Sequence, residues 1–347
     1  MHHDYDFAIV GGGPAGAACA IKAAQHGRRV LLLERSNGDY DAPGETLHPG
    51  IAPLLQQLGI SEEELAEVTG ARHAGVWVEW AGERRFQAYR PAAKEEEEDA
   101  AEEWLGYQVH RRTFDAMLRQ RAQALGVTVQ LNASVPSPLL EDGVVCGLSS
   151  DGEEIRAQVV VDATGRNRWL TRALEISSSE HSPPLHARYG YAQGSCPARA
   201  DAPLMQANAK AWTWSARVRQ DVYQWTHLSL DGTKLPSDWM PEELRHLQAL
   251  GSMRGADVTW RIADETCGPG WFLIGDAAAI LDPSSSHGVL KALMSGIMAA
   301  HLAEPVLLGK APEQEAGMAY QTWLHGWFAN DVAQLRQFYG ELGTLGA

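Results

Sequence analysis

Cysteine is scarce in this chain, which has only four in 347 residues, at Cys19, Cys146, Cys196 and Cys267. No two of them lie at the spacing of metal ligands. Sparse, scattered thiols are typical of a reducing compartment rather than of a secreted, disulfide-linked domain. We therefore expect a cytoplasmic protein without a metal centre.

Positive charge is also in short supply. Lysine and arginine number 29 against 44 acidic residues, and the net charge is -15. An acidic surface repels both nucleic acid and anionic lipid, so neither is an expected partner. The acidic run at 95–103 favours a solvated loop, with a docking patch for a basic protein as the alternative.

Long apolar runs are missing as well. Asp276 interrupts the most apolar tract, 271–281, and residues 1–6 contain no apolar segment of the kind found in signal peptides. The sequence therefore predicts neither a membrane span nor a targeting segment.

What the chain does have is a 45% hydrophobic composition, enough for a sizeable core. Residues 7–10 predict a buried strand, 15–24 a helix and 29–33 a second strand, which together form a βαβ unit. Helices are also expected at 54–67, 114–125, 288–308 and 313–342. Strands are expected at 76–80, 127–131, 144–149, 155–161, 211–230, 257–262 and 272–275, and residues 176–210 read as loop or crossover.

The strongest motif is G-x-G-x-x-G at Gly11, Gly13 and Gly16, which follows the first strand and opens the first helix. This is the context of a dinucleotide fingerprint. Gly11 permits the turn, Gly13 lets a diphosphate approach the backbone, and Gly16 lets the helix pack on the strand. The helix N-terminus attracts the phosphates, and Glu34, at the end of the second strand, can accept hydrogen bonds from a ribose. Further cofactor contacts are expected from Pro14, Ala15, Arg35 and Val135.

Three further segments carry a family resemblance. Val161–Arg166 resembles the "ATG" segment, Ile274–Ala278 the "GD" segment and Arg111–Asp115 the R-x-x-F-D element of flavoproteins with two dinucleotide folds. Together they resemble the flavin-dependent monooxygenase and halogenase superfamily. The resemblance implies FAD as cofactor, with Arg111 reaching the FAD, Asp276 binding its ribityl chain, and Gly165 and Gly275 beside it.

The expected fold is α/β, with a Rossmann-like FAD domain of the aromatic-hydroxylase type, an inserted smaller β-sheet substrate domain and a C-terminal helical tail. We assign the FAD domain to 1–60, 106–175 and 263–310, the substrate domain to 61–105 and 176–262, and the tail to 311–347. A helix that starts near Gly288 would point its N-terminus at the flavin and stabilise its reduced form. Pro283 and Val289 would lie beside it.

The resemblance also implies the chemistry, in which a flavin C4a-hydroperoxide transfers oxygen to an aromatic ring. No second G-x-G-x-x-G is present for a nicotinamide domain, so the electron donor could be NAD(P)H directly or through a reductase. Candidate catalytic residues are His73, His287 and Lys291. Both histidines could exchange protons near neutral pH, although His73 could equally be a structural strand-end residue.

Halogenation is the alternative, together with hydroxylation of a small aromatic molecule. The tryptophans of Trp212–Arg217 match the W-x-W part of a halogenase motif, but the Ile-Pro that follows is absent. No lysine lies near Arg72–Val76, our best match to the halogenase lysine segment. We therefore favour hydroxylation. A flavin-bearing binding module without turnover is a third possibility.

Two segments resemble a narrower branch, the flavoproteins that mature the tryptophylquinone cofactors of bacterial amine oxidases and dehydrogenases. They are Gly44–Pro49 and Asp282–Gly296. This resemblance implies a tryptophan side chain of a precursor protein as substrate. If only 61–105 and 176–262 cover the flavin, the lid is thin, which suits a protein or peptide. Five tryptophans of the expected substrate sheet could line an aromatic surface, although core packing is the commoner role: Trp77, Trp80, Trp212, Trp214 and Trp225.

Overall fold

A parallel sheet forms one half of the molecule. The structure is a computed structural model that describes residues 3–38, 42–80, 82–89 and 104–341. Strand β1 (Tyr5–Val10) lies between β2 (Val30–Glu34) and β11 (Glu153–Asp162), with β8 (Thr128–Leu131) and β20 (Trp271–Leu273) beyond them, all parallel. The remaining strands of this sheet are β9 (Ser137–Glu141), β10 (Val144–Ser150) and β19 (Cys267–Gly268). The predicted βαβ unit is confirmed by β1, α1 (Pro14–Gln25) and β2.

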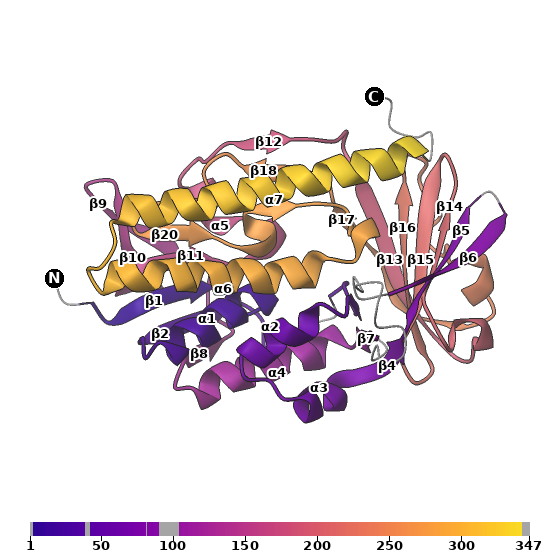
Figure 1. Cartoon of the computed structure of the whole chain (residues 1–347), viewed down its shortest axis with the longest axis horizontal. Helices are drawn as coiled ribbons and strands as arrows, with labels where there is room; N and C mark the ends of the chain where they lie inside the picture. Colours follow the sequence, from indigo (N-terminus) through magenta and orange to yellow (C-terminus); the bar gives the residue numbers. More distant parts are fainter. Residues whose placement is uncertain (1–2, 39–41, 81, 90–103, 342–347) are drawn as a thin grey trace, which may run out of the picture.

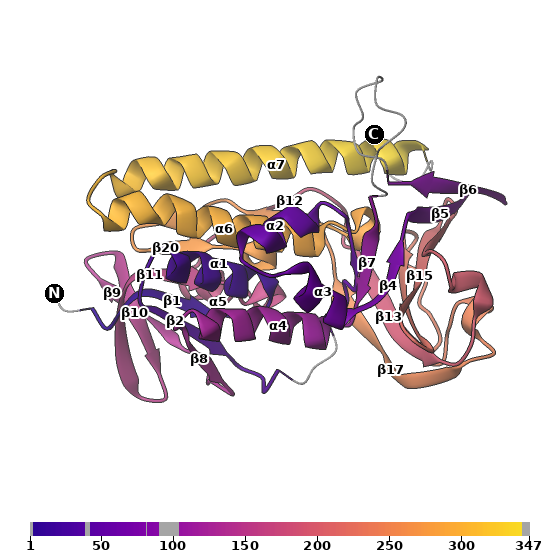
Figure 2. The same cartoon turned by 60° about the horizontal axis from the view of Figure 1, so that its bottom comes forward.

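Helices α1, α6 (Gly288–Leu307) and α7 (Glu313–Glu341) lie beside this sheet, with α6 and α7 running side by side (Figures 1 and 2). A Cβ on Gly296 would stand 2.2 Å from the carbonyl oxygen of Ala15, so α6 packs directly on α1. Within the described residues, α6 alone is long and apolar enough to cross a membrane by length and composition. Its close contact with α1 gives it the packing of a core helix.

A seven-stranded sheet forms the second half, in the order β17-β13-β16-β15-β14-β5-β6. The expectation of loop or crossover at 176–210 is wrong, because this segment contains β13, between β16 and β17. Its tyrosines alternate with small residues and pack against the neighbouring strands, which outweighs the Ser, Pro and Ala content. The bounds are β5 (Gly75–Trp80), β6 (Glu83–Ala88), β13 (His186–Gln193), β14 (Leu204–Ala207), β15 (Ala211–Arg219), β16 (Val222–Ser229) and β17 (Gln248–Asp257).

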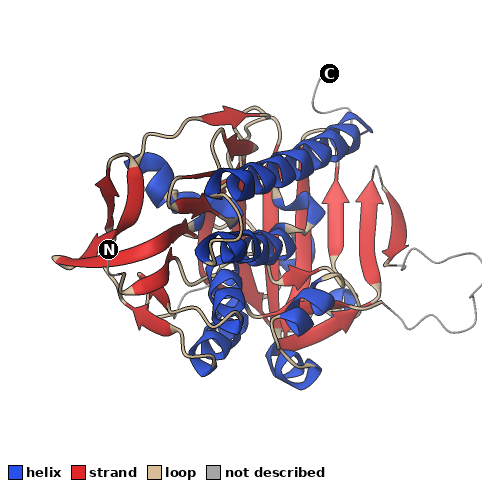
Figure 3. Cartoon of the chain, turned by 60° about the vertical axis from the view of Figure 1, so that its left-hand side comes forward, coloured by secondary structure: helices blue, strands red, loops and turns tan. Residues whose placement is uncertain are grey.

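Two small sheets and several helices join the halves. Figure 3 shows the helices in blue and the strands in red. The single helix expected at 54–67 is in fact two, because Gly59 adopts a φ of +75° and Ser61 caps a new helix with a Ser61–Glu64 capping box. The bounds are α2 (Ile51–Gln57), α3 (Glu62–Val68), α4 (Arg111–Ala124), α5 (Trp169–Ala173), β3 (Thr46–Leu47), β4 (Thr69–His73), β7 (Gly106–Val109), β12 (Ser178–Glu180), β18 (Arg261–Ala263) and β21 (Ala279–Ile280).

The tail helix α7 reaches from the parallel sheet to the seven-stranded sheet (Figure 1). Near its start, the Tyr320 hydroxyl donates to the carbonyl of Leu273 at 2.7 Å. Near its end, the indole N–H of Trp212 donates to the hydroxyl of Tyr339 at 2.8 Å. All four residues are buried, so α7 ties the two halves together. The domain boundaries themselves stay a prediction, and the acidic run at 95–103 lies wholly outside the described residues.

Candidate active site

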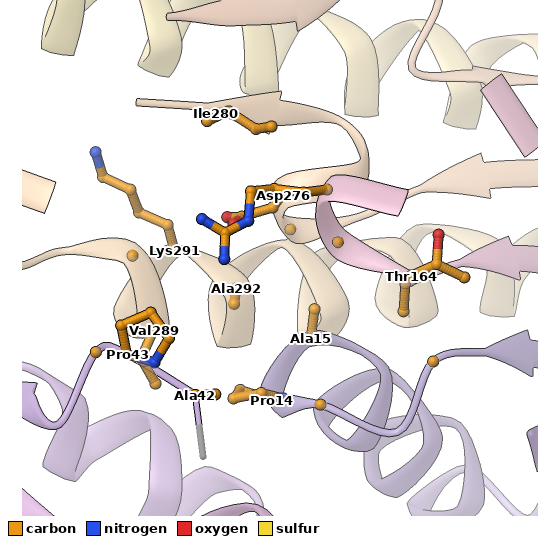
Figure 4. Close-up of a pocket in the computed structure, with 18 of the residues that line it drawn as sticks. Pro14, Ala15, Ala42, Pro43, Thr164, Asp276, Ile280, Val289, Lys291 and Ala292 are labelled. Atoms are coloured by element: carbon orange, nitrogen blue, oxygen red, sulfur yellow. The ribbon is translucent and has the colours of Figure 1, made fainter. Parts of the chain in front are cut away.

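One large cavity of about 610 Å³ lies where the two halves meet. Segments from the carboxyl end of the parallel sheet, the start of α6, the seven-stranded sheet and α7 line it. Ligands of open α/β sheets bind at this end of the strands. All the predicted cofactor residues except Gly16 line the cavity, and Figure 4 shows several of their side chains around one space.

The first turn of α1 has no side-chain cap. Its N-cap is Gly13, and no side chain accepts a hydrogen bond from the turn. The contrast is α3, where Ser61 and Glu64 provide a full capping box. Uncapped amides at a helix N-terminus, open to a cavity, form a binding site for a phosphate group.

The glycines of the motif fall into two groups. Added Cβ atoms would meet backbone at Gly11, 2.3 Å from the oxygen of Ala163, and at Gly16, 1.9 Å from the oxygen of Gly11. These glycines are required by packing. At Gly13 and Gly288 an added Cβ would meet nothing within 4 Å, although both residues line the cavity. Bare backbone therefore faces the cavity from α1 and from α6, as a close-lying ligand requires.

Glu34 is buried and already engaged by the protein. Its carboxylate accepts from the amide of Gly12 at 2.8 Å and from the amide and hydroxyl of Ser36 at 2.9 and 2.8 Å. These donors fix the carboxylate at the cavity wall. Each carboxylate oxygen can accept more than one hydrogen bond, so a ribose hydroxyl can still be bound.

Arg111 begins α4 and is held on two sides. It forms a bidentate pair with Asp115, with both N···O distances 2.9 Å, and donates to the carbonyl of Pro43 at 2.7 Å. The pair fixes the guanidinium beside the cavity. It also anchors the loop that contains Pro43 and Gly44, which lies between α4 and the start of α6.

The "ATG" segment is shaped by Asp162, which is fully buried at the end of β11. Its carboxylate accepts from the amide and hydroxyl of Thr164 at 2.8 and 2.7 Å and from the amide of Leu170 at 2.8 Å. This network turns the chain so that Gly165, with a φ of +60°, lines the cavity.

The "GD" segment follows β20. Gly275 adopts a φ of +58°, and its amide donates to the Ser295 hydroxyl at 2.9 Å, which sets Asp276 in the wall of the cavity. Surrounding protein raises the pKa of Asp276 by desolvation, with Arg166, Arg111 and Lys291 opposing the rise. The Asp276 side chain nevertheless faces the open cavity rather than packed atoms (Figure 4). Its carboxylate is therefore available to a ligand hydroxyl.

The other half of the cavity is aromatic. Trp212 and Trp214 project from β15, Tyr189 from β13, and Trp323 and Trp327 from α7. Trp77, Trp80 and Trp225 are not among its lining residues, so packing decides their positions. The polar groups Gln224 and Thr226 of β16 lie in the same wall.

Lys291 is the one lysine among the described residues that line this cavity. Its ammonium pairs with Asp331 and lies 4.0 Å from the ring centroid of Trp327, both on α7. Burial lowers the pKa of Lys291, and Asp331 opposes that change. A lysine therefore stands at the boundary between the aromatic wall and the start of α6.

The two candidate histidines do not line the cavity. His287 stacks edge-on against His48 with ring centroids 5.1 Å apart, and His73 lies 5.5 Å from the ring of Tyr89, which also contacts His48. Burial lowers the pKa of each histidine to about 4. Both rings are therefore neutral near pH 7, in a cluster of aromatic side chains behind the loop before α6.

Two groups of lining residues were missed by sequence reasoning. One is the aromatic face of α7, because the argument for a thin lid counted only 61–105 and 176–262. The other is Glu45, a buried carboxylate that accepts from the hydroxyl of Tyr191. Glu45 belongs to the segment Gly44–Pro49, which the sequence singled out only for its family resemblance and without a role for this carboxylate.

An uncapped helix opening, bare glycines, a carboxylate in the cavity wall and an adjoining aromatic pocket are the features expected of an FAD-dependent oxidoreductase. Comparison with known proteins gives the family. The profile of the FAD binding domain family matches residues 4–315, and the chain belongs to this family.

The relatives include two halogenating enzymes. One is the 1H-pyrrole-2-carbonyl-[peptidyl-carrier protein] brominase of Pseudoalteromonas luteoviolacea, 28% identical, with 93% of this chain and 82% of the relative covered. Another is the tryptophan 2-halogenase of Chondromyces crocatus, 27% identical, with 95% and 67% covered. These matches support an FAD-dependent enzyme of the halogenase and monooxygenase type.

The solved structure of the flavin-dependent brominase Bmp2 superposes with a TM-score of 0.84 at 23% identity, over 96% of this chain and 87% of that one. At this identity the likeness shows the fold alone. It confirms the predicted α/β fold of the aromatic-hydroxylase type.

Proposed function

We propose that this protein is an FAD-dependent monooxygenase that hydroxylates an indole ring, presented as a tryptophan side chain of a precursor protein in tryptophylquinone biogenesis. The observation that carries the proposal is the aromatic wall of Trp212, Trp214, Trp323 and Trp327 facing the predicted flavin position. Flat aromatic rings stack favourably on such walls, in offset or edge-to-face geometry.

The residues of the cofactor half fit FAD. The amides of α1 would hold the diphosphate, Glu34 the ribose and Asp276 the ribityl chain, while Gly288 would leave room for the ring. Bound FAD supplies the oxygen-activating redox chemistry, and the protein positions the substrate and excludes water.

The chain's own polar groups would orient the substrate. Gln224 and Thr226 are linked by a 2.7 Å hydrogen bond, and both offer hydrogen-bonding atoms in a mostly apolar pocket. Lys291 can donate to the oxygen that is transferred or to a developing negative charge on it. Its pairing with Asp331 holds the ammonium in place for that role.

Halogenation is the second candidate, and specific observations favour it. The relatives just described are halogenating enzymes, and Lys291 supplies a lysine within the cavity although none lies near His73. A protein-bound substrate agrees with either reaction, since one relative is named for a substrate held on a peptidyl carrier protein.

The test is aerobic incubation of the reduced, FAD-loaded enzyme with a tryptophan-containing peptide, read by mass spectrometry. We expect the peptide to gain one oxygen atom, and that atom should come from isotopically labelled O₂. A peptide with phenylalanine in place of tryptophan is the control. A product that carries bromine or chlorine and forms only with added halide would assign halogenation, rather than hydroxylation, to this enzyme. Modification of free indole or phenol but not of the peptide would exclude the protein substrate.

A further inference from the structure

Glu45 is a buried acid that lies near three elements: β3, β13 and the start of α6. It is 3% exposed, stands directly before β3 and lines the cavity. One carboxylate oxygen accepts from Tyr191, and the other, Oε2, is buried without a hydrogen-bond partner. A buried carboxylate with one unsatisfied oxygen is costly when ionised, so the neutral acid is favoured.

Its neighbour Gly44 lies against the first turn of α6. A Cβ on Gly44 would stand 3.6 Å from Cγ2 of Val289, in the first turn of α6, and 3.1 Å from Nη1 of Arg111. Glu45 therefore lies one residue from the contact between its loop and the helix start that faces the predicted flavin ring.

Tyr191 lies between this acid and a second recess. It lies on β13, its hydroxyl donates to Glu45 and lies 3.5 Å from the carbonyl oxygen of Ala42, and the residue also lines a second, smaller recess of about 230 Å³. That recess includes Gly251, Ser252 and Arg254, which are exposed. A hydroxyl that donates its hydrogen to Glu45 keeps its lone pairs, through which it can accept a proton from a donor.

We propose that Glu45 and Tyr191 form a proton relay that carries protons from solvent in the recess beside β13 into the flavin cavity. The proposal rests on the proposed function only in needing a reaction that consumes protons there. Hydroxylation does so, since ArH + O₂ + 2e⁻ + 2H⁺ gives ArOH + H₂O. Halogenation also does so, since ArH + X⁻ + O₂ + 2e⁻ + 3H⁺ gives ArX + 2H₂O. A hydride donor or a reductase supplies the two electrons in either case.

The charged surroundings are compatible with a proton donor. Desolvation raises the pKa of Glu45 to about 7, while the Tyr191 hydrogen bond, the Arg111 charge and the backbone amides of Glu45 and Gly44 oppose the rise. Arg111 is itself neutralised by its bidentate pair with Asp115. An acid with a pKa near the working pH can both give up and regain its proton.

The first experiment needs neither cofactor nor turnover. Infrared spectra of the apoprotein are recorded against pH, and the Glu45→Gln spectrum is subtracted to isolate the carbonyl stretch of protonated Glu45 from other buried acids. The expected midpoint is near 7. Tyr191→Phe removes a hydrogen bond that lowers the pKa, so its midpoint should rise above that of the wild type. Tyr189→Phe removes a hydroxyl from the same face of β13, and it should leave the midpoint unchanged.

The second experiment tests the relay in the FAD-loaded protein, through the pH dependence of oxygen consumption by the reduced enzyme. Even without an aromatic substrate, one proton is taken up when O₂ reoxidises the reduced flavin anion and is itself reduced to hydrogen peroxide. The rate of oxygen consumption by the wild type should fall above the pH at which Glu45 titrates. In Glu45→Gln that fall should be flattened. Tyr191→Phe should consume oxygen slowly, and a small weak acid added to the buffer should restore its rate. An unaltered pH profile in Glu45→Gln, or a Glu45 already ionised at pH 5, would overturn the relay. Failure to oxidise any aromatic ring, with both experiments as expected, would instead overturn the proposed function alone.

Discussion

Replacing Glu45 with glutamine should change how the stability of the protein depends on pH. The pKa of Glu45 is raised from 4.5 to about 7, chiefly because burial penalises the charged form. In the unfolded chain the group ionises with its ordinary pKa near 4.5. Between these two values the folded protein holds a proton that the unfolded chain has lost, so unfolding releases a proton.

The sign follows from that release. The stabilisation from neutral Glu45 is fully present below about pH 4.5 and is lost progressively as the pH rises to about 7. Each pKa unit corresponds to about 1.36 kcal/mol, so the total loss is about 3 kcal/mol. Glutamine is nearly the same size and does not titrate. The wild type should therefore lose about 3 kcal/mol relative to Glu45→Gln across this window.

The assay is urea unfolding of the apoprotein by tryptophan fluorescence, at several pH values from 4.5 to 8. The measured quantity is the free energy of unfolding of the wild type minus that of the variant. Glu141→Gln is the control, because Glu141 is exposed, pairs with Arg156 and has a lowered pKa. Its difference should show no fall from pH 5 to 7. A flat difference for Glu45→Gln over the same range would mean that Glu45 is charged in the folded protein, and the argument from burial would fail.

Four further substitutions separate binding, chemistry and packing. Gly13→Ala should leave the melting temperature unchanged yet weaken FAD binding in a titration, because its Cβ enters the open cavity. Gly16→Ala should instead lower the melting temperature, because its Cβ would overlap backbone. Lys291→Met should retain FAD but lower the rate of aromatic oxidation about 10²-fold; an unchanged rate would remove Lys291 from the mechanism. Tyr339→Phe should lower the free energy of unfolding by about 1–3 kcal/mol, because the buried indole N–H of Trp212 loses its acceptor. Amide hydrogen exchange at the end of α7 should speed up.

The cofactor half of the site was predictable because its signals are local. The turn at Gly11, the helix opening at Gly13 and the strand ending at Glu34 lie within one βαβ unit, so spacing along the chain fixes spacing in the fold. The "ATG" and "GD" segments follow two parallel strands, and their residues meet because such strands end at the same edge. For these reasons the sequence, through its family resemblance, indicated FAD, and every predicted cofactor residue except Gly16 lines the cavity.

The substrate half was much less predictable. His73 and His287 were chosen for their chemistry and their nearness to motifs, yet they pack together with His48 and Tyr89 away from the cavity. Trp323 and Trp327 were not considered, because the amphipathic pattern of 313–342 predicts a helix without saying what that helix covers. Lys291 was the exception, because it lies one turn into a helix whose start was already assigned to the flavin.

By itself, then, the sequence determined the nucleotide-binding unit, the class of cofactor and the family, since each depends on residues close together in the chain. Tertiary structure decided the walls of the substrate pocket and the contact between Glu45 and Tyr191, which are 146 positions apart. Those features depend on how α7 and the seven-stranded sheet pack against the parallel sheet. Contacts of that kind leave no periodic or local mark in the sequence, because each partner alone has the pattern of an ordinary buried strand, loop or helix.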